Sequence, residues 1–292
     1  MLTRNNAASV PDPLLAPNLV EAVLSKLGLQ KRPSLDLAGL NSVFAAVSGK
    51  IPFDNVRKRI WFAGPQIGPL PGGDPTEFFS NWLRHGTGGT CWPLNGGVYA
   101  LLRTLGFDAR RIVGSVIVEG YPQGANHGSI LVTLDGTDYV ADAWMASFKA
   151  LPLAPGRPTS TGGGIHDIRS VPTGNAFEIL SYAGWLREQP LPFRIEPEYD
   201  PVDHAFFLDR AERTKVVGFF NDAVFISRHF PDSILTLGRH SKFRVAADGS
   251  LTKTQPSGTE RKAALVEEFG LSEEIVDAIP TDVSGGVAPP GL

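Results

Sequence analysis

Residues 88–97 read Gly-Gly-Thr-Cys-Trp-Pro-Leu-Asn-Gly-Gly, and this stretch decides the fold. After it, apolar residues recur at positions 94, 98, 101, 102 and 105, and Gly106 follows where a helix would end. The pattern predicts a buried helix that begins at or just after Cys91. Because the N–H groups of a helix N-terminus favour a thiolate, Cys91 is a candidate nucleophile. The competing interpretation is a small buried apolar residue, which is the commoner role of a free cysteine.

A predicted hairpin downstream supplies partners for this cysteine. Strands are expected over residues 129–134 and 138–141, with Asp135-Gly136 as a two-residue turn. Pairing Leu134 with Thr137 then places His127 and Asp142 on the same face as diagonal neighbours. A carboxylate at that distance would orient the imidazole, whose other nitrogen could accept the thiol proton. The spacing therefore predicts a Cys91–His127–Asp142 triad.

Composition limits the classes of function that remain. The 292 residues are 42% hydrophobic and 20% charged, with a formal net charge of -3, which is typical of a globular protein. Without a basic run or a long apolar stretch, neither nucleic acid nor a membrane is expected as a partner. One cysteine excludes an intramolecular disulfide, and the N-terminus has no secretion signal, so we expect a cytoplasmic protein. No metal site or phosphate-binding glycine motif is predicted.

On either side of this stretch, the predicted secondary structure changes from helices to strands and, near the C-terminus, back to a helix. Helical patterns dominate residues 18–85, with apolar faces over 19–27, 37–47 and 75–85. Strand patterns follow at 111–118 and in the hairpin, and further strands are expected over 213–226 and 243–247. Residues 262–269 predict a last amphipathic helix, and the tail from 281 is rich in glycine and proline. These patterns indicate an α+β fold.

The residues resemble those of the arylamine N-acetyltransferases. That family has an Arg-Gly-Gly-x-Cys-x-x-x-Asn block, which Gly88-Gly89-Thr90-Cys91 and Asn95 resemble, and a Pro-Phe-Glu-Asn element, which residues 52–55 resemble. Its catalytic histidine precedes a strand and its aspartate follows a hairpin, as His127 and Asp142 do. The resemblance runs from about residue 19 to 279.

The resemblance implies a fold and an activity. The expected units are a helical bundle with the nucleophile (1–95), an antiparallel β-barrel with His and Asp (96–200), and an α/β lid with a flexible tail (201–292). Cys91 would take an acetyl group from acetyl-CoA as a thioester and pass it to an arylamine, arylhydroxylamine or hydrazine nitrogen. Phe53, Trp92 and Trp144 would contact the substrates. Acetyl-CoA is a co-substrate, no cofactor is permanently bound, and a homodimer is compatible with the family.

Three departures from the family pattern affect the substrates. Thr87 replaces the arginine of the cysteine block, so Asp54 is expected to bond Thr87 or Arg84 instead. Pro93 replaces a glutamate, and Ala143-Trp144-Met145-Ala146 replaces Val-Gly-Phe-Gly, which should reshape the acyl pocket. Three alternatives therefore remain open: an amide synthase with another acyl donor, a cysteine hydrolase with the same triad, and a non-enzymatic ligand-binding protein.

Overall fold

The computed structural model describes residues 12–117, 124–145, 147–174, 176–181, 193–198, 201–216, 218 and 220–283. Its helices are α1 (Pro17–Lys26), α2 (Leu37–Lys50), α3 (Val56–Ala63), α4 (Pro75–His85), α5 (Cys91–Leu105), α6 (His204–Arg213), α7 (Gly258–Glu267) and α8 (Glu273–Asp277). The 3₁₀ helices are η1 (Ala143–Met145) and η2 (Gly164–His166). Within these residues, none of the helices has the length and apolar character needed to cross a membrane.

Strands form two antiparallel sheets. One has five strands in the order β1 (Phe53–Asp54), β10 (Ile226–Phe230), β11 (Ser233–Leu237), β12 (Lys242–Ala246), β13 (Leu251–Thr254). The other has eight, in the order β5 (Leu151–Pro152), β4 (Thr137–Val140), β3 (His127–Leu134), β2 (Asp108–Ile117), β9 (Phe193–Glu198), β8 (Ala176–Ser181), β7 (Ile168–Thr173), β6 (Thr159–Ser160). The predicted α+β class is therefore confirmed.

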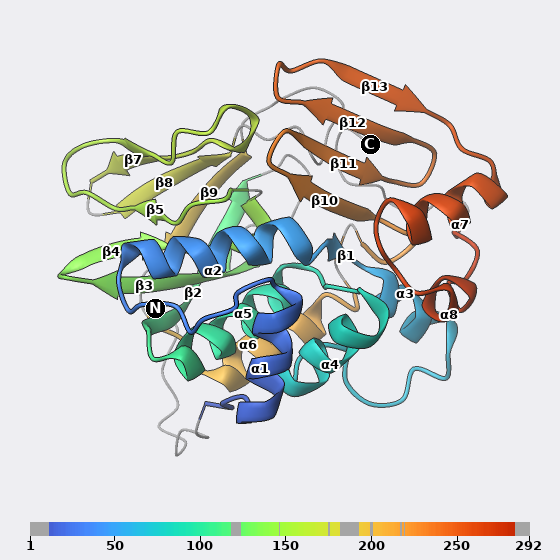
Figure 1. Cartoon of the computed structure of the whole chain (residues 1–292), viewed down its shortest axis with the longest axis horizontal. Coiled ribbons are helices and arrows are strands. Elements are labelled where there is room, and N and C mark those ends of the chain that lie inside the picture. The colour runs from blue at the N-terminus through green and yellow to red at the C-terminus, as the bar shows by residue number, and fades with distance from the viewer. Residues whose placement is uncertain are drawn as a thin grey trace.

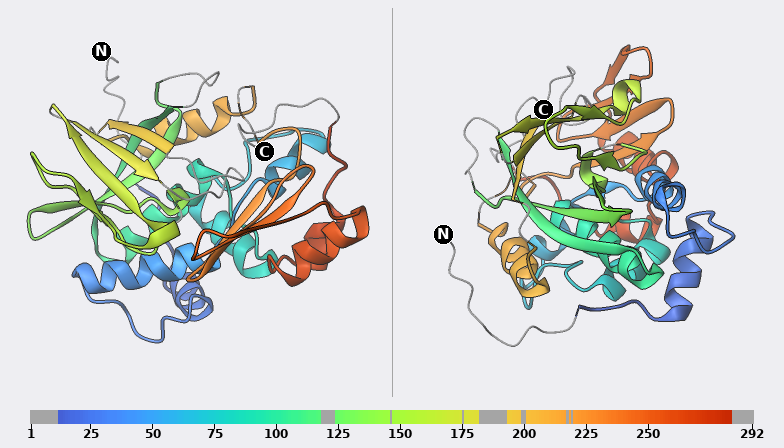
Figure 2. Two further views of the ribbon diagram at one scale, coloured as in Figure 1. Left: turned by 90° about the horizontal axis from the view of Figure 1, so that it is seen from above. Right: turned by 90° about the vertical axis from the view of Figure 1, so that its left-hand side faces the viewer.

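The two sheets lie beside each other on one side of a group of helices. Figure 1 shows α1, α4, α5 and α6 grouped below the eight-stranded sheet, with the five-stranded sheet at the upper right beside α7 and α8. In the left view of Figure 2 the eight-stranded sheet, green to yellow, and the orange five-stranded sheet stand on opposite sides. Helix α5 contacts β2, β3, α4 and α6. The helix that begins with the cysteine is thus central to the packing.

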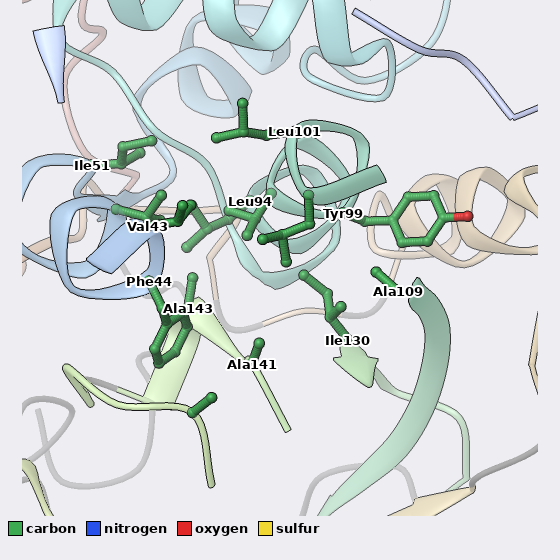
Figure 3. Close-up of a cluster of buried hydrophobic side chains, with 14 of the residues drawn as sticks. Val43, Phe44, Ile51, Leu94, Tyr99, Leu101, Ala109, Ile130, Ala141 and Ala143 are labelled. Atoms are coloured by element: carbon green, nitrogen blue, oxygen red, sulfur yellow. The ribbon is translucent and has the colours of Figure 1, made fainter. Parts of the chain in front are cut away.

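One large apolar core joins the helices to the hairpin. It includes Val43 from α2, Leu94 and Leu101 from α5, and Ile130 from β3, each almost wholly buried. Figure 3 shows Val43 and Leu94 between α2 and α5, and Ile130 on the side of α5 that faces the hairpin. Because such interiors are close-packed, the core fixes α5 relative to the strands that carry His127 and Asp142.

Local sequence signals explain the boundaries of these elements. Asp36 and Asp74 cap α2 and α4 by accepting hydrogen bonds from backbone N–H groups three residues on. In the hairpin, Leu134 pairs with Thr137, and Asp135 and Gly136 have φ of 48° and 75°. Positive φ at both central residues is the geometry that matches the twist of a two-residue hairpin. The predicted turn and register are confirmed.

The predicted barrel is not closed by backbone pairing in the described residues. Its sheet is open, and its edge strands β5 and β6 have only two residues each. Pro152 in β5 has no N–H to donate, and the Thr159 hydroxyl of β6 instead donates to the Pro152 carbonyl. Between β5 and β6, where the barrel would close, a side-chain hydrogen bond therefore takes the place of backbone pairing.

Residues 213–226 were expected to form a strand, and this prediction was wrong. Helix α6 continues to Arg213, residues 214–216 form a turn, and β10 begins only at Ile226. Asp203 caps α6 by accepting a hydrogen bond from the Phe206 N–H, which is a helix-start signal. The sequence prediction used the apolar residues of 213–226 and gave this signal no weight. Strand β12 and helix α7 do form where the sequence predicts a strand and a helix.

Candidate active site

Three separate elements bring Cys91, His127 and Asp142 together. Cys91 is the first residue of α5, His127 is the first of β3, and Asp142 lies between β4 and η1. His127 is 1% exposed and Asp142 is 0% exposed. His127 Nε2 lies 2.6 Å from Asp142 Oδ2. The hydrogen bond that the hairpin register predicted is therefore present.

Asn95 connects this pair to the helix of the cysteine. Its amide donates to Asp142 Oδ1 at 2.8 Å and to the Gly128 carbonyl at 2.7 Å. Its own oxygen accepts from the Ala143 N–H at 3.0 Å. Asn95 lies one helical turn after Cys91, so it shares a face of α5 with the thiol. It fixes the carboxylate relative to the helix N-terminus.

The ionisation of His127 and that of Asp142 are coupled. Burial alone would lower the pKa of His127, but the charge of Asp142 and a hydrogen bond to Cys91 outweigh it and raise that pKa to about 10. Burial raises the pKa of Asp142, yet the His127 imidazole more than offsets this and keeps it below the ordinary value. The site therefore favours an imidazolium at His127 beside an ionised carboxylate at Asp142.

Asp54 holds the loop that leads into the cysteine. Its carboxylate accepts from the Gly88 N–H at 2.6 Å and from the Val56 N–H at 2.9 Å. The expected bond from Asp54 to Thr87 or Arg84 was wrong: the Thr87 hydroxyl has no partner among the described residues, and Arg84 pairs with Glu274 at the surface. A short aspartate reaches the adjacent backbone, so no arginine is needed. Burial raises the pKa of Asp54 to about 6, despite these two backbone hydrogen bonds.

The aromatic residues predicted to bind substrate surround the triad but are almost wholly buried. The ring of Trp144 lies against His127 at a tilt of 50°, with ring centroids 4.7 Å apart, and Trp92 meets Phe207 edge-on at 4.9 Å. Phe53 packs against Phe220 at 5.2 Å. Of these three candidates, only Trp92 lines the cavity described next. The bulky Trp144 and Met145 lie in η1, while Ala146 is outside the described residues.

A cavity of about 510 Å³ opens beside the N-terminus of α5. Its wall includes Thr90 and Trp92, which flank Cys91 in sequence, and it extends to α3 and α6 through Lys58 and Ala211. Ala211 also packs in the small apolar cluster that Cys91 contacts. Apolar side chains and a few polar groups are the usual lining of a small-molecule site. Among the described residues no His, Cys, Asp and Glu group could hold a metal ion.

A comparison with models of known protein families places this chain in a family. A family model described as N-acetyltransferase matches residues 36–277, most of the chain. The chain belongs to the arylamine N-acetyltransferase family. The sequence resemblance to that family is thereby confirmed.

Individual arylamine N-acetyltransferases are distant relatives in sequence. Arylamine N-acetyltransferase 2 of Macaca mulatta is 30% identical over 132 residues, which are 44% of this chain and 43% of that protein. Proansamycin X synthase of Amycolatopsis mediterranei is 28% identical over 125 residues, 42% of this chain and 46% of that protein. These matches span less than half the length of either relative.

A solved arylamine N-acetyltransferase shares the fold. The structure of the M. smegmatis enzyme has a TM-score of 0.76 and 18% sequence identity, with 91% of this chain and 98% of that chain covered. At this identity the similarity bears on the fold alone.

Two residues near the site had no predicted role. Asn95 was recognised only as part of the cysteine block, although its position one turn after Cys91 was a signal that it shares the thiol's face. Lys58 lies between Arg57 and Arg59, and all three side chains are buried. Lysine and arginine usually face solvent, so the burial of these three could be learned only from the tertiary structure.

Proposed function

We propose that the protein is an arylamine N-acetyltransferase that acts through a Cys91 thioester by a ping-pong mechanism. The observation that carries the proposal is the buried His127–Asp142 pair at 2.6 Å with Cys91 as a further hydrogen-bond partner of the imidazole. Membership of the family and the cavity beside Cys91 support it. Acetyl-CoA is the proposed donor, and an arylamine, arylhydroxylamine or hydrazine is the proposed acceptor.

The chemistry follows from the charges of the site. The Cys91 thiolate attacks the acetyl carbonyl, a new C–S bond forms, and the bond to the sulfur of CoA breaks. The imidazolium of His127 gives its proton to the departing CoA thiolate. The acceptor nitrogen then attacks the thioester, loses a proton to His127, and releases Cys91 as a thiolate. Asp142 stabilises the imidazolium throughout.

Intact-mass analysis tests the covalent step. Incubation with acetyl-CoA should add one acetyl group to the chain, and a hydrazine should remove it. Since Cys91 is the only cysteine, Cys91→Ser should abolish the adduct. Acetylation of Cys91→Ser at the rate of the unmodified protein would contradict the nucleophile assignment. Fast loss of the adduct to water without an amine would instead assign a hydrolase.

An amide synthase is the second candidate. The similarity to proansamycin X synthase favours it, as does Trp144 against His127, which changes the surroundings of the acyl group. Acylation of Cys91 by p-nitrophenyl acetate but not by acetyl-CoA would support this candidate. A Cys91 that neither reagent acylates and iodoacetamide does not alkylate would point to a ligand-binding protein.

Further features of the organisation and location of the chain belong to the proposal. The C-terminal unit of β10–β13, α7 and α8 would act as a lid, and the division 1–95, 96–200 and 201–292 would describe the domains. A cytoplasmic location and the absence of a nucleic acid partner stay predictions from the composition. The oligomeric state is left open, with a homodimer as one expected form.

A further inference from the structure

Lys58 is a buried ammonium without a paired carboxylate. It lies on α3 and is 7% exposed. Its Nζ donates to the Thr214 carbonyl at 3.1 Å and to the Thr214 hydroxyl at 2.8 Å. Within the described part of the chain, no carboxylate lies at ion-pair distance from it. Burial of an unpaired charge is costly, so its presence beside a cavity requires an explanation.

The acidic groups around Lys58 are engaged elsewhere. Glu212 on α6 accepts from the Leu70 N–H and pairs with Lys215. Asp54 accepts from two backbone N–H groups, as described above, and Glu77 binds the neighbouring Arg57. The cavity wall also includes Asp74, which caps α4, and His204 on α6. None of these groups in the described residues neutralises Lys58 by direct contact.

Cys91 is the remaining ionisable group that interacts with Lys58. Lys58 lines the same cavity as Thr90 and Trp92, the residues on either side of Cys91, and as Ala211. Burial lowers the pKa of Lys58 to about 8, and electrostatic attraction to Cys91 and Glu212 opposes that decrease. The ammonium therefore shares a cavity with the two residues that flank the sulfur in sequence. The buried pair of His127 and Asp142 supplies the other charges of the site.

We propose that Lys58 is a positioning residue that stabilises the Cys91 thiolate by its charge, so that the sulfur lies between the imidazolium of His127 and this ammonium. The inference rests on the proposed nucleophilic role of Cys91. No bond to Lys58 forms or breaks, and His127 alone exchanges the thiol proton. Lys58 acts while it is protonated, so its contribution is present at pH 7 and is lost as the pH rises above about 8.

Alkylation by iodoacetamide without any acyl donor tests this inference. The chain has one cysteine, so the mass adduct reports Cys91 alone. Lys58→Met should slow alkylation at pH 7 on the order of tenfold, the effect of removing one nearby charge. The difference from the unmodified protein should disappear above about pH 9, where Lys58 is neutral. Lys58→Arg should stay close to the unmodified rate at pH 7 and keep its advantage at the higher pH.

Matched variants separate charge from structure. Thr214→Val removes one acceptor but keeps the ammonium, so it should preserve most of the alkylation rate. Lys26→Met removes an exposed lysine on α1 that donates to the carbonyls of Trp82 and Leu83, and it should have no effect. A folded Lys58→Met protein that follows the unmodified rate at every pH would overturn the inference. So would a Lys58→Arg protein as slow as Lys58→Met. Because no donor is present, absence of transfer from acetyl-CoA would refute the proposed function and leave this result intact.

Discussion

Both carboxylate oxygens of the buried Asp142 side chain make hydrogen bonds. Oδ2 bonds the His127 ring, while Oδ1 accepts from the Asn95 amide and from the Trp144 N–H at 3.0 Å. A buried carboxylate with this many donors stays ionised, as the lowered pKa of Asp142 indicates. A substitution can therefore keep the hydrogen-bond geometry of Asp142 and remove its charge.

Asp142→Asn should keep the geometry and remove the charge. The amide oxygen can still accept from Asn95 and Trp144, but it cannot stabilise an imidazolium. We expect turnover with a hydrazine acceptor to fall by about 10³–10⁴-fold, with little change in the melting temperature. Asp138→Asn, in the same hairpin but paired with Arg110, should leave turnover unchanged. Equal turnover of Asp142→Asn and the unmodified enzyme would remove Asp142 from the mechanism.

Asp54 should give acyl-enzyme formation a dependence on pH near 6. Its pKa is raised to about 6, so its carboxylate is protonated as the pH falls through that value. A protonated oxygen would face a backbone N–H and lose one hydrogen bond to the loop before Cys91. Asp54→Asn should slow acylation on the order of tenfold above pH 7, the cost of about one hydrogen bond, and remove the inflection near pH 6. A variant that keeps this inflection would assign it to another group.

At the scale of elements, β1 links the loop before Cys91 to the C-terminal sheet. Phe53 and Asp54 pair with Ser227 and Ile226 of β10, and the Asp54 N–H donates to the Gly89 carbonyl at 3.1 Å. Asn55 follows, and its side chain bonds the carbonyls of Phe220 and Ala223 and the N–H of Phe225. A short segment from the N-terminal half thus supports a loop more than 160 residues later.

Asn55→Ala should destabilise the fold by about 3 kcal/mol, because three buried backbone groups lose their partner. Chemical denaturation measures this loss. Asn41→Ala is the matched control, since Asn41 accepts one hydrogen bond, from the Ala150 N–H, and should cost about 1 kcal/mol. Equal losses in the two variants would show that the contacts of Asn55 do not hold the 220–225 loop.

At the scale of the molecule, buried histidines lie where the two sheets approach. His229 of β10 is 2% exposed, and its ring centroid lies 6.4 Å from that of His166 in η2. His166 also contacts Phe148 and bonds the Phe230 carbonyl at 2.8 Å. Burial, with a smaller effect of His166, lowers the pKa of His229 to about 3. The native contact between the two sheets therefore requires a neutral His229.

Stability should consequently fall in acid. Below pH 6.5 the unfolded chain protonates His229 while the native chain does not, so the free energy of unfolding decreases as the pH falls toward 3. Between pH 7 and pH 5, His229 accounts for about 2 kcal/mol of the decrease in the free energy of unfolding. His229→Leu should remove that share in denaturant titrations at the two pH values, whereas His240→Leu, an exposed histidine, should not. An unchanged difference in His229→Leu would show that the buried imidazole is not responsible.

Much of the site was determined by local sequence. The Asp135-Gly136 turn needs positive φ at both residues, and this requirement set the register that pairs His127 with Asp142. The start of α5 at Cys91 followed from the apolar spacing after it. Turn conformation and helical periodicity depend on neighbouring residues, so the sequence alone determined these elements and the α+β class.

Tertiary structure decided what depends on residues distant in the chain. The burial of Lys58 needs Thr214, the position of Asp54 needs Gly88, and the open edge of the eight-stranded sheet depends on Pro152 meeting Thr159. Where a strand was expected over 213–226, residues 214–216 form a turn and Asn55 holds the loop at 220–225. Such contacts are set by close packing between elements, and a one-dimensional pattern carries no record of which elements meet.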